Sequence, residues 1–259
     1  MRLLRFYPIY RRELKSYLAS PTVYVAAALF LFLSGLFFYG ILENFSRLSA
    51  DAQYRREMGF EKLNFTRHVV SNLFWVVNFL LLFVVPAFTM RLLAEEKKSG
   101  TFELLVSLPF TEWNIVIAKF LAAYTVIAAM LVVSAYYVLI MMRFGVPELP
   151  VVAVAYVGAF IVAGGYVAIG LFASSLTENQ IVAAIISFVA LLGLYMIGDL
   201  TTPTSSGFGK ILELLSLRYH SEPFTLGLLR LQDVGFFLVL IVSFLFLTCR
   251  MLEIRKWRV

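Results

Sequence analysis

Long apolar stretches without any charged side chain constrain this chain more than any other feature. Five such stretches contain no Asp, Glu, Lys or Arg, and a sixth, shorter one lies between Asp233 and Arg250; they cover residues 22–42, 69–90, 120–142, 151–177, 179–198 and 234–249. A helix of about 20 apolar residues crosses a hydrocarbon core about 30 Å thick. In lipid, only helices and closed barrels satisfy every backbone polar group. We therefore expect an all-α membrane protein.

The boundaries of these stretches predict six transmembrane helices, over about 22–42, 69–90, 115–142, 151–176, 179–198 and 233–250. Together they form one transmembrane domain, residues 21–259, which follows a separate segment, residues 1–20. The first stretch is not expected to be a cleaved signal peptide. Signal cores are about 7–15 residues long, whereas this stretch is longer and ends in bulky aromatic residues.

Basic residues flank the apolar region at both ends of the chain. Five precede the first stretch and four follow the last: Arg2, Arg5, Arg11, Arg12 and Lys15, then Arg250, Arg255, Lys256 and Arg258. An even number of spans places both termini on one side, and the positive-inside rule makes that side the cytoplasm. We expect a multi-pass protein of the bacterial cytoplasmic membrane with both termini inside. The net charge of +6 then reflects topology, and no nucleic-acid partner is expected.

Residues 2–20 show the periodicity of an amphipathic helix. Apolar side chains recur at steps of three and four, with cations between them: Leu3, Phe6, Tyr10, Leu14, Tyr17 and Leu18. Such a helix would lie at the cytoplasmic interface with its apolar face in the acyl chains. The alternative is a basic flank that only sets the topology.

The cytoplasmic segment 91–119 contains several helix signals. Gly100 suits the left-handed position that ends a helix, and Thr101 can cap the next one, over about 102–108, which Pro109 ends. Thr111 is expected to cap a third helix. This arrangement predicts a short transverse helix between two spans, which a partner could push as a rigid unit.

Two acids precede this element. Glu95 and Glu96 lie near the C-terminus of the second span, where the helix dipole disfavours carboxylates. They are either a solvated charge cluster or acids that pair with arginines of the N-terminal helix or of a partner. The residues alone leave both interpretations open.

The remaining loops predict less. Thr177 and Gln180 have the spacing of a capping box before the fifth span. Residues 211–230 are amphipathic and are interrupted by Pro223 and Gly227, which predicts one or two short helices at the outer interface. His68 and His220 are expected to be isolated surface residues.

Sequence patterns for catalysis are absent. No phosphate-binding loop and no cluster of His and Cys is present, so we expect no enzymatic activity, no bound cofactor and no metal. The interiors of the spans contain amides and hydroxyls, such as Asn78 and Ser134, but no ionisable group. Ion-coupled carriers usually need such groups. The energy for any transport must therefore come from outside the chain.

At this point the sequence resembles a known family, the membrane subunits (permeases) of type II ABC exporters, also called ABC-2 type. The resemblance covers essentially the whole chain, and its closest subgroup is the gliding-motility-type permease. It rests on six spans, an amphipathic N-terminal helix, and the motifs Glu95-Glu96-Lys97-Lys98-Ser99-Gly100-Thr101-Phe102-Glu103-Leu104-Leu105, Leu108-Pro109, Lys119-Phe120, the segment 170–180, Leu214-Ser216-Leu217 and the ending Arg255-Lys256-Trp257.

The resemblance implies roles for particular residues. Residues 102–108 would be the coupling helix that docks on a cytoplasmic ATPase, residues 1–20 a connecting helix, and segment 208–230 the lining of the exit. Glu95 or Glu96 would pair with Arg11 or Arg12. The implied coupling residues are Glu95, Glu96, Gly100, Thr101, Phe102, Glu103, Leu105 and Pro109, and those of the connecting helix are Arg5, Arg11, Arg12 and Glu13.

It also implies partners. Two ATPase subunits, which bind ATP and Mg, would assemble with two permeases, the second being an identical chain or a paralogue, and a periplasmic accessory subunit could join them. Two alternatives remain open. One is a permease dedicated to metalloenzyme maturation, and the other is a non-transporting anchor that transmits ATPase motion to a periplasmic partner. The substrate and the direction of transport are not encoded in any motif.

Overall fold

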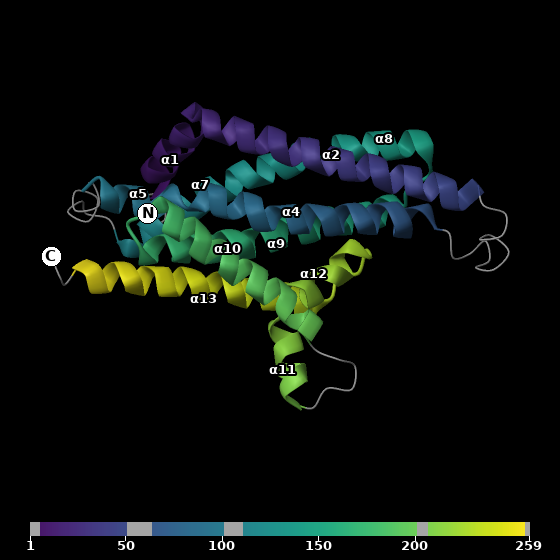
Figure 1. Ribbon diagram of the computed structural model, residues 1–259. Coiled ribbons are helices and arrows are strands. Elements are labelled where there is room, and N and C mark those ends of the chain that lie inside the picture. Colours follow the sequence, from purple (N-terminus) through teal and green to yellow (C-terminus); the bar gives the residue numbers. More distant parts are fainter. Residues whose placement is uncertain (1–5, 51–63, 101–110, 201–206, 257–259) are drawn as a thin grey trace.

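The computed structural model describes residues 6–50, 64–100, 111–200 and 207–256, and every regular element within these ranges is a helix (Figure 1). The all-α prediction is therefore confirmed for the described residues. In chain order the elements are α1 (Tyr7–Ala19), α2 (Pro21–Ala50), the π-helix η3 (Thr66–Val70), α4 (Ser71–Thr89), α5 (Arg91–Lys98), α7 (Glu112–Val133), α8 (Tyr136–Phe144), α9 (Leu149–Leu176), α10 (Gln180–Met196), the 3₁₀-helix η4 (Ile197–Leu200), α11 (Gly207–Leu215), α12 (Leu217–Thr225) and α13 (Leu231–Lys256).

Five described helical segments are long and apolar enough to cross a membrane: Pro21–Ala50, Thr66–Lys98, Glu112–Phe144, Leu149–Leu176 and Leu231–Ile254. This pattern fits a multi-pass membrane protein. The helix α10 is apolar but has only 17 residues, and η4 continues it directly. A sixth crossing by α10 stays a prediction.

The helix α9 is the centre of the bundle. It packs against α4, α7, α10, α12 and α13. Its small residues Ala155, Ala159 and Ala163 are at most 2% exposed, and small side chains let helix backbones approach closely in lipid. This ridge of small residues therefore serves packing within the chain.

The third long segment bends between α7 and α8 without a proline or glycine at the bend. Ser134 Oγ donates to the carbonyl of Leu131 at 2.7 Å, and such back-bonding by serine often bends helices. After the bend, Tyr137 Oη donates to the carbonyl of Leu31 at 2.7 Å. This bond joins α8 to α2.

The N-terminal helix α1 lies across the end of the bundle at which α5 and the C-terminal end of α13 also lie, and we call this the α1 end (Figure 1). Ile9 packs against Ile115 and Ala118 of α7, and Tyr10 Oη lies 3.1 Å from Thr125 Oγ1. The helix is therefore present as expected. Part of the apolar face that was expected in acyl chains is instead packed on α7.

Two local predictions need correction. Asn179, not Thr177, caps α10, because its side chain accepts from the backbone N–H of Ile181 at 2.9 Å. Pro223 lies inside α12 and does not interrupt it, whereas Gly227, with φ of +78°, follows the end of that helix. The helix α12 packs on α9, α10 and α4, while Tyr219 and Glu222 on it are exposed; its location at the outer interface stays a prediction.

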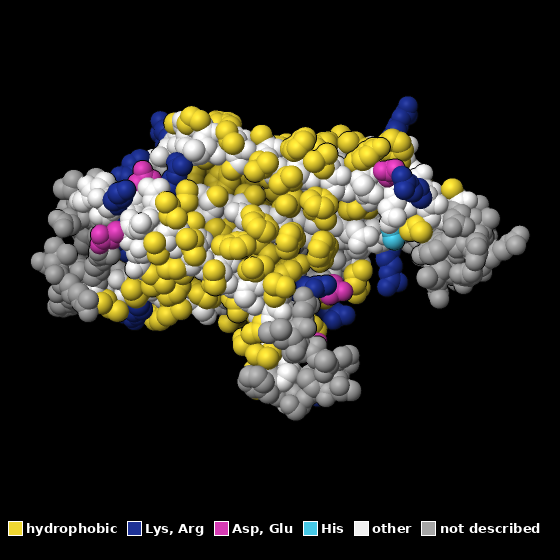
Figure 2. Space-filling view, viewed as in Figure 1, with side chains coloured by type: hydrophobic (Ala, Val, Ile, Leu, Met, Phe, Trp, Pro, Cys, Tyr) yellow, Lys and Arg dark blue, Asp and Glu magenta, His cyan; other side chains and the backbone are white. Residues whose placement is uncertain are grey.

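Apolar side chains cover the middle of the face drawn in Figure 2, and charged side chains gather toward its two ends and beside α12. This distribution is the one that a lipid-spanning bundle requires, because charged groups are costly in the hydrocarbon core.

The contact between α9 and α12 provides a stability test. A Cβ atom at Gly158 would lie 2.2 Å from Phe224 Cβ, whereas a Cβ at Gly193 of α10 meets nothing within 4 Å. We expect Gly158→Ala to lower the free energy of unfolding by about 1–3 kcal/mol through overpacking, and Gly193→Ala to leave it unchanged or slightly raised. Thermal unfolding in detergent measures the stability of both variants. Equal unfolding midpoints for Gly158→Ala and Gly193→Ala would contradict the close contact between Gly158 and Phe224.

Candidate functional site

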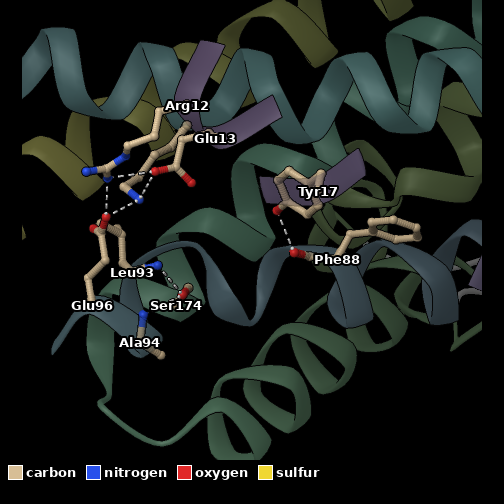
Figure 3. Close-up of polar contacts among 9 residues, drawn as sticks. Arg12, Glu13, Tyr17, Phe88, Leu93, Ala94, Glu96 and Ser174 are labelled. Carbon is tan, nitrogen blue, oxygen red and sulfur yellow. Dashed lines mark hydrogen bonds and ion pairs between the residues drawn. The ribbon is translucent and has the colours of Figure 1, made fainter. Parts of the chain in front are cut away.

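Four charged side chains meet at the α1 end of the bundle, and we call them the charge cluster: Arg12, Glu13, Glu96 and Lys119 (Figure 3). Lys119 Nζ lies 2.9 Å from Glu96 Oε1 and 3.2 Å from Glu13 Oε1. Arg12 Nη2 lies 3.0 Å from each of the same two oxygens. The cluster joins α1, α5 and α7 and contains two cations and two carboxylates.

Burial differs across the cluster. The side chain of Lys119 is only 1% exposed, those of Glu13 and Glu96 are 14% and 15% exposed, and that of Arg12 is 60% exposed. A buried ammonium must be paired, because the desolvation of an unpaired charge is strongly unfavourable. Lys119 therefore requires carboxylates from two other helices, and this requirement fixes where α1 and α5 lie on α7.

Burial of the Arg12 guanidinium acts to lower its pKa, but hydrogen bonds and charge interactions with Glu13 and Glu96 outweigh this effect, and the net pKa of Arg12 is raised. Arg12 therefore stays protonated at any physiological pH, and the cluster keeps its second cation.

Neighbouring polar contacts hold the same helices in place (Figure 3). Tyr17 Oη donates to the carbonyl of Phe88 at 2.8 Å, and burial raises the pKa of this hydroxyl, which therefore remains a donor. Ser174 Oγ of α9 accepts from the backbone N–H groups of Leu93 and Ala94 at 3.0 and 3.1 Å. Leu93 is the third residue of α5, where a backbone N–H has no acceptor within the helix, so Ser174 satisfies this group and also accepts from the next amide.

An open cavity of about 420 Å³ lies beside the charge cluster. Besides cluster residues, its lining includes Tyr17, Arg91 and Glu95. Charged groups of both signs surround it, so this cavity suits contacts with a charged protein surface better than an apolar ligand.

The residues predicted from sequence fall into three groups. Glu96 pairs with Arg12, as predicted, and Gly100 has the predicted left-handed conformation, with φ of +71°. Glu95 and Arg11 form no ion pair with another described residue. Six predicted residues lie outside the described ranges: Arg5, Thr101, Phe102, Glu103, Leu105 and Pro109.

The part that Lys119 plays was not predicted from the sequence. The sequence pointed only to the motif Lys119-Phe120, whereas the structure places Lys119 two turns inside α7, with its side chain buried. The observable signal was an isolated lysine among apolar residues, together with acids in two segments expected at the same membrane face.

A second buried ionic contact joins α12 to α13. His220 Nδ1 lies 2.7 Å from Asp233 Oδ1, and Asp233 is 0% exposed. The imidazole stacks on the ring of Phe236 at a centroid distance of 4.0 Å. The expectation that His220 is an isolated surface residue is therefore wrong.

The hydrogen bonds of His220 determine how many protons this pair holds. Nε2 lies 3.1 Å from the carbonyl of Leu214, which can only accept, so Nε2 carries a proton. The 2.7 Å contact between Nδ1 and Asp233 Oδ1 then needs a second proton on one of these two atoms. The pair is therefore neutral overall, as imidazolium with carboxylate or as imidazole with carboxylic acid.

Among the described residues, no group of three or more His, Cys, Asp or Glu side chains could hold a metal ion. The two buried ionic contacts each join side chains from different helices.

Comparison with known proteins gives one family. Residues 7–205 match the model of the ABC-2 family transporter protein. This match spans most of the chain, and the protein belongs to this family. No curated protein sequence matches the chain at a significant level. ABC-2 permeases are membrane components of transport systems and are not themselves catalytic.

Removing the buried ammonium tests the charge cluster. The Lys119→Met substitution keeps a long apolar side chain but removes the ammonium. Of the two cations that contact both Glu13 and Glu96, only Arg12 then remains. We expect a loss of about 1–3 kcal/mol in unfolding free energy, less than for a fully buried pair because both acids are partly exposed. Arg47→Met, which removes an exposed ion pair with Glu43, should change stability by less than about 1 kcal/mol. Equal thermal midpoints for the two variants would contradict the assigned role of Lys119.

Two substitutions at one position test the contact between α12 and α13. In Asp233→Asn the amide nitrogen can donate to His220 Nδ1 while Nε2 still donates to Leu214, so we expect near-normal stability. In Asp233→Ala the nitrogen is left buried without a partner, at a cost of about 1–3 kcal/mol. Thermal unfolding at neutral pH measures both, and an Asn variant as unstable as the Ala variant would refute the proton count.

Proposed function

We propose that this ABC-2 family member is the membrane-spanning permease of an ABC transporter of the bacterial cytoplasmic membrane. It would move its substrate with energy from ATP that a separate subunit hydrolyses. The working unit would contain two such ATPases, with their ATP and Mg, and two permeases, the second being identical or a paralogue. The subgroup that the sequence most resembles is the gliding-motility-type permease, and a role in gliding does not follow from that resemblance.

The charge cluster is the observation that supports this proposal best. The helix α5 ends at Lys98 and α7 begins at Glu112, so these two helices flank the segment expected to contain the coupling helix. Glu96 and Lys119 lie on the two flanks and are in contact with each other. A force that an ATPase applies to this segment would therefore reach both flanking helices together.

The cluster would also pass this motion to the N-terminal helix. Arg12 and Glu13 connect α1 to both flanks, and α2 begins at Pro21, two residues after α1 ends. Displacement of α5 and α7 would thus turn α1 and the start of the first span with them. In this proposal Glu96 and Arg12 are transmission residues, and Glu95, which lines the adjoining cavity, is free to contact the ATPase surface.

The proposed topology has six spans and cytoplasmic termini. Supporting it, α1 and the C-terminal end of α13 lie at the same end of the bundle (Figure 1), as an even number of crossings requires. The sixth crossing would be α10 extended by η4. The α1 end would then face the cytoplasm, and α11 and α12 would lie at the outer side, close to the exit.

A charge swap tests this function and separates docking from folding. Glu96→Lys gives the cluster three cations and one carboxylate, so we expect loss of the co-purifying ATPase. Arg12→Glu combined with Glu96→Lys restores two charges of each sign and should recover at least part of the ATPase. The measurement is affinity purification in mild detergent, with mass spectrometry and an ATPase assay, and Arg47→Glu serves as a distant control.

Membrane insertion of all variants is checked by fractionation. Wild-type ATPase recovery with Glu96→Lys would contradict the transmission role, and a wild-type chain that purifies without any ATPase would contradict the permease function. If the complex hydrolyses ATP but moves no solute, the non-transporting anchor becomes the better hypothesis.

A further inference from the structure

A polar recess lies where η3 and the start of α4 face α12. It has a volume of about 680 Å³, and we call it the outer recess. Six of its lining residues form two facing walls: Arg67, His68, Asn72 and Trp75 come from η3 and α4, and Arg218 and Glu222 come from α12. It is separate from the charge cluster, with which it shares no residue.

The charges around the outer recess are predominantly positive. Among the described residues, two arginines and one carboxylate line it, so their net charge is +1 with His68 neutral. Arg67 is exposed and forms no ion pair or side-chain hydrogen bond with another described residue. Glu222 lines the same cavity but does not approach Arg67 within ion-pair distance. The guanidinium of Arg67 therefore lines the recess with N–H donors that are not used by another described residue.

The positions of the arginines in their helices add to this excess. Arg218 is the second residue of α12, and Arg67 is the second residue of η3, where the helix that continues as α4 begins. Cations near a helix N-terminus oppose the dipole, whereas an anion there is stabilised. An anion in the recess would offset both arginines.

The α12 wall is held firmly. Ser71 Oγ of α4 donates to the carbonyl of Thr225 at 3.0 Å, and His220 pairs with buried Asp233. Phe224 packs directly on Gly158 of α9. The distance between the two helices that bear the arginines is thus set by buried contacts, so the recess is pre-organised.

The opposite wall has an unusual backbone. Residues Thr66–Val70 form a π-helix, a conformation that is rare and is found frequently at functional sites. This turn holds Arg67 and His68, and the side-chain amide of Asn72 donates to the carbonyl of His68 at 2.7 Å. Trp75, 42% exposed, adds an aromatic surface that stacks on Phe79.

We propose that the outer recess binds an anionic group, a phosphate or carboxylate, through Arg67 and Arg218, with the non-polar part of the ligand against Trp75. Guanidinium groups bind such planar or tetrahedral oxyanions through paired hydrogen bonds. The ligand has two possible sources: the headgroup of a membrane phospholipid, or a soluble anion from the aqueous side. This inference does not depend on the ATPase partnership and would survive its failure.

The test uses the full chain purified in neutral detergent, with and without the double substitution Arg67→Gln and Arg218→Gln. Arg47→Gln is the matched control, because Arg47 is an exposed arginine that does not line the recess. The lipid arm measures binding of phosphatidylglycerol by native mass spectrometry, against a neutral diacylglycerol. The soluble arm measures inorganic phosphate by calorimetry.

We expect the double variant to lose at least about tenfold in affinity for one of the two anions, since each lost charge-assisted contact changes binding by roughly that factor. Loss in the lipid arm assigns a phospholipid headgroup, and loss in the soluble arm assigns a soluble oxyanion. If neither anion binds the wild type, or if the double variant and Arg47→Gln bind both anions equally, the site is refuted. Because Arg67 is exposed, Arg67→Gln alone should fold normally and show a partial loss.

Discussion

A lysine side chain with almost no exposed surface has to find carboxylates, and in this protein Lys119 finds them on two helices that are far apart in sequence. Glu13 comes from the N-terminal helix and Glu96 from the end of the second long segment. An ion pair of this kind contributes little net stability compared with apolar packing, but breaking it is expensive. Its effect is therefore to permit one arrangement of α1, α5 and α7 and to penalise the others. A constraint on the relative positions of three helices is useful where the displacement of one helix must displace the other two.

The same physical device appears on α12. This short helix is held by a buried His–Asp pair and by a serine that donates to its last carbonyl. Neither α1 nor α12 is long enough to cross a membrane, so burial of an apolar stripe alone would place them loosely. Specific polar contacts with defined donors fix them more precisely, because a displaced helix would leave a buried polar group unpaired. The helix α12 is thereby fixed on α9, and α1 is fixed on α7, which packs on α9.

Much of the fold could be predicted from sequence, because the bilayer core favours helices and excludes charged side chains. Charge-free stretches mark helices, and the left-handed Gly100 and the capping Thr111 were identified from local chemistry. The pairing of Glu96 with Arg12 followed only from family resemblance. The positions of Lys119, His220 and Asp233 could not be predicted, because each depends on which helix packs beside it, and periodicity carries no information about neighbours. Asn179 was missed as a cap because the wider Thr-x-x-Gln pattern was given priority over the adjacent residue.

The arrangement of α9 suggests how events at the two ends can be connected. It contacts α5, which bears Glu96, through Ser174 near one end, and it contacts α12 through Gly158 in its other half. Gly158, Ala159 and Ala163 allow neighbouring helices to approach its backbone closely. Because the surrounding core is tightly packed, α9 can move as one rigid body. A shift of α5 would pull on Ser174, and the same helix, moving as a unit, would press on Phe224 of α12. If α9 moves as a unit in this way, a displacement of α5 would reach α12, which forms one wall of the outer recess, without a chain of side-chain rearrangements.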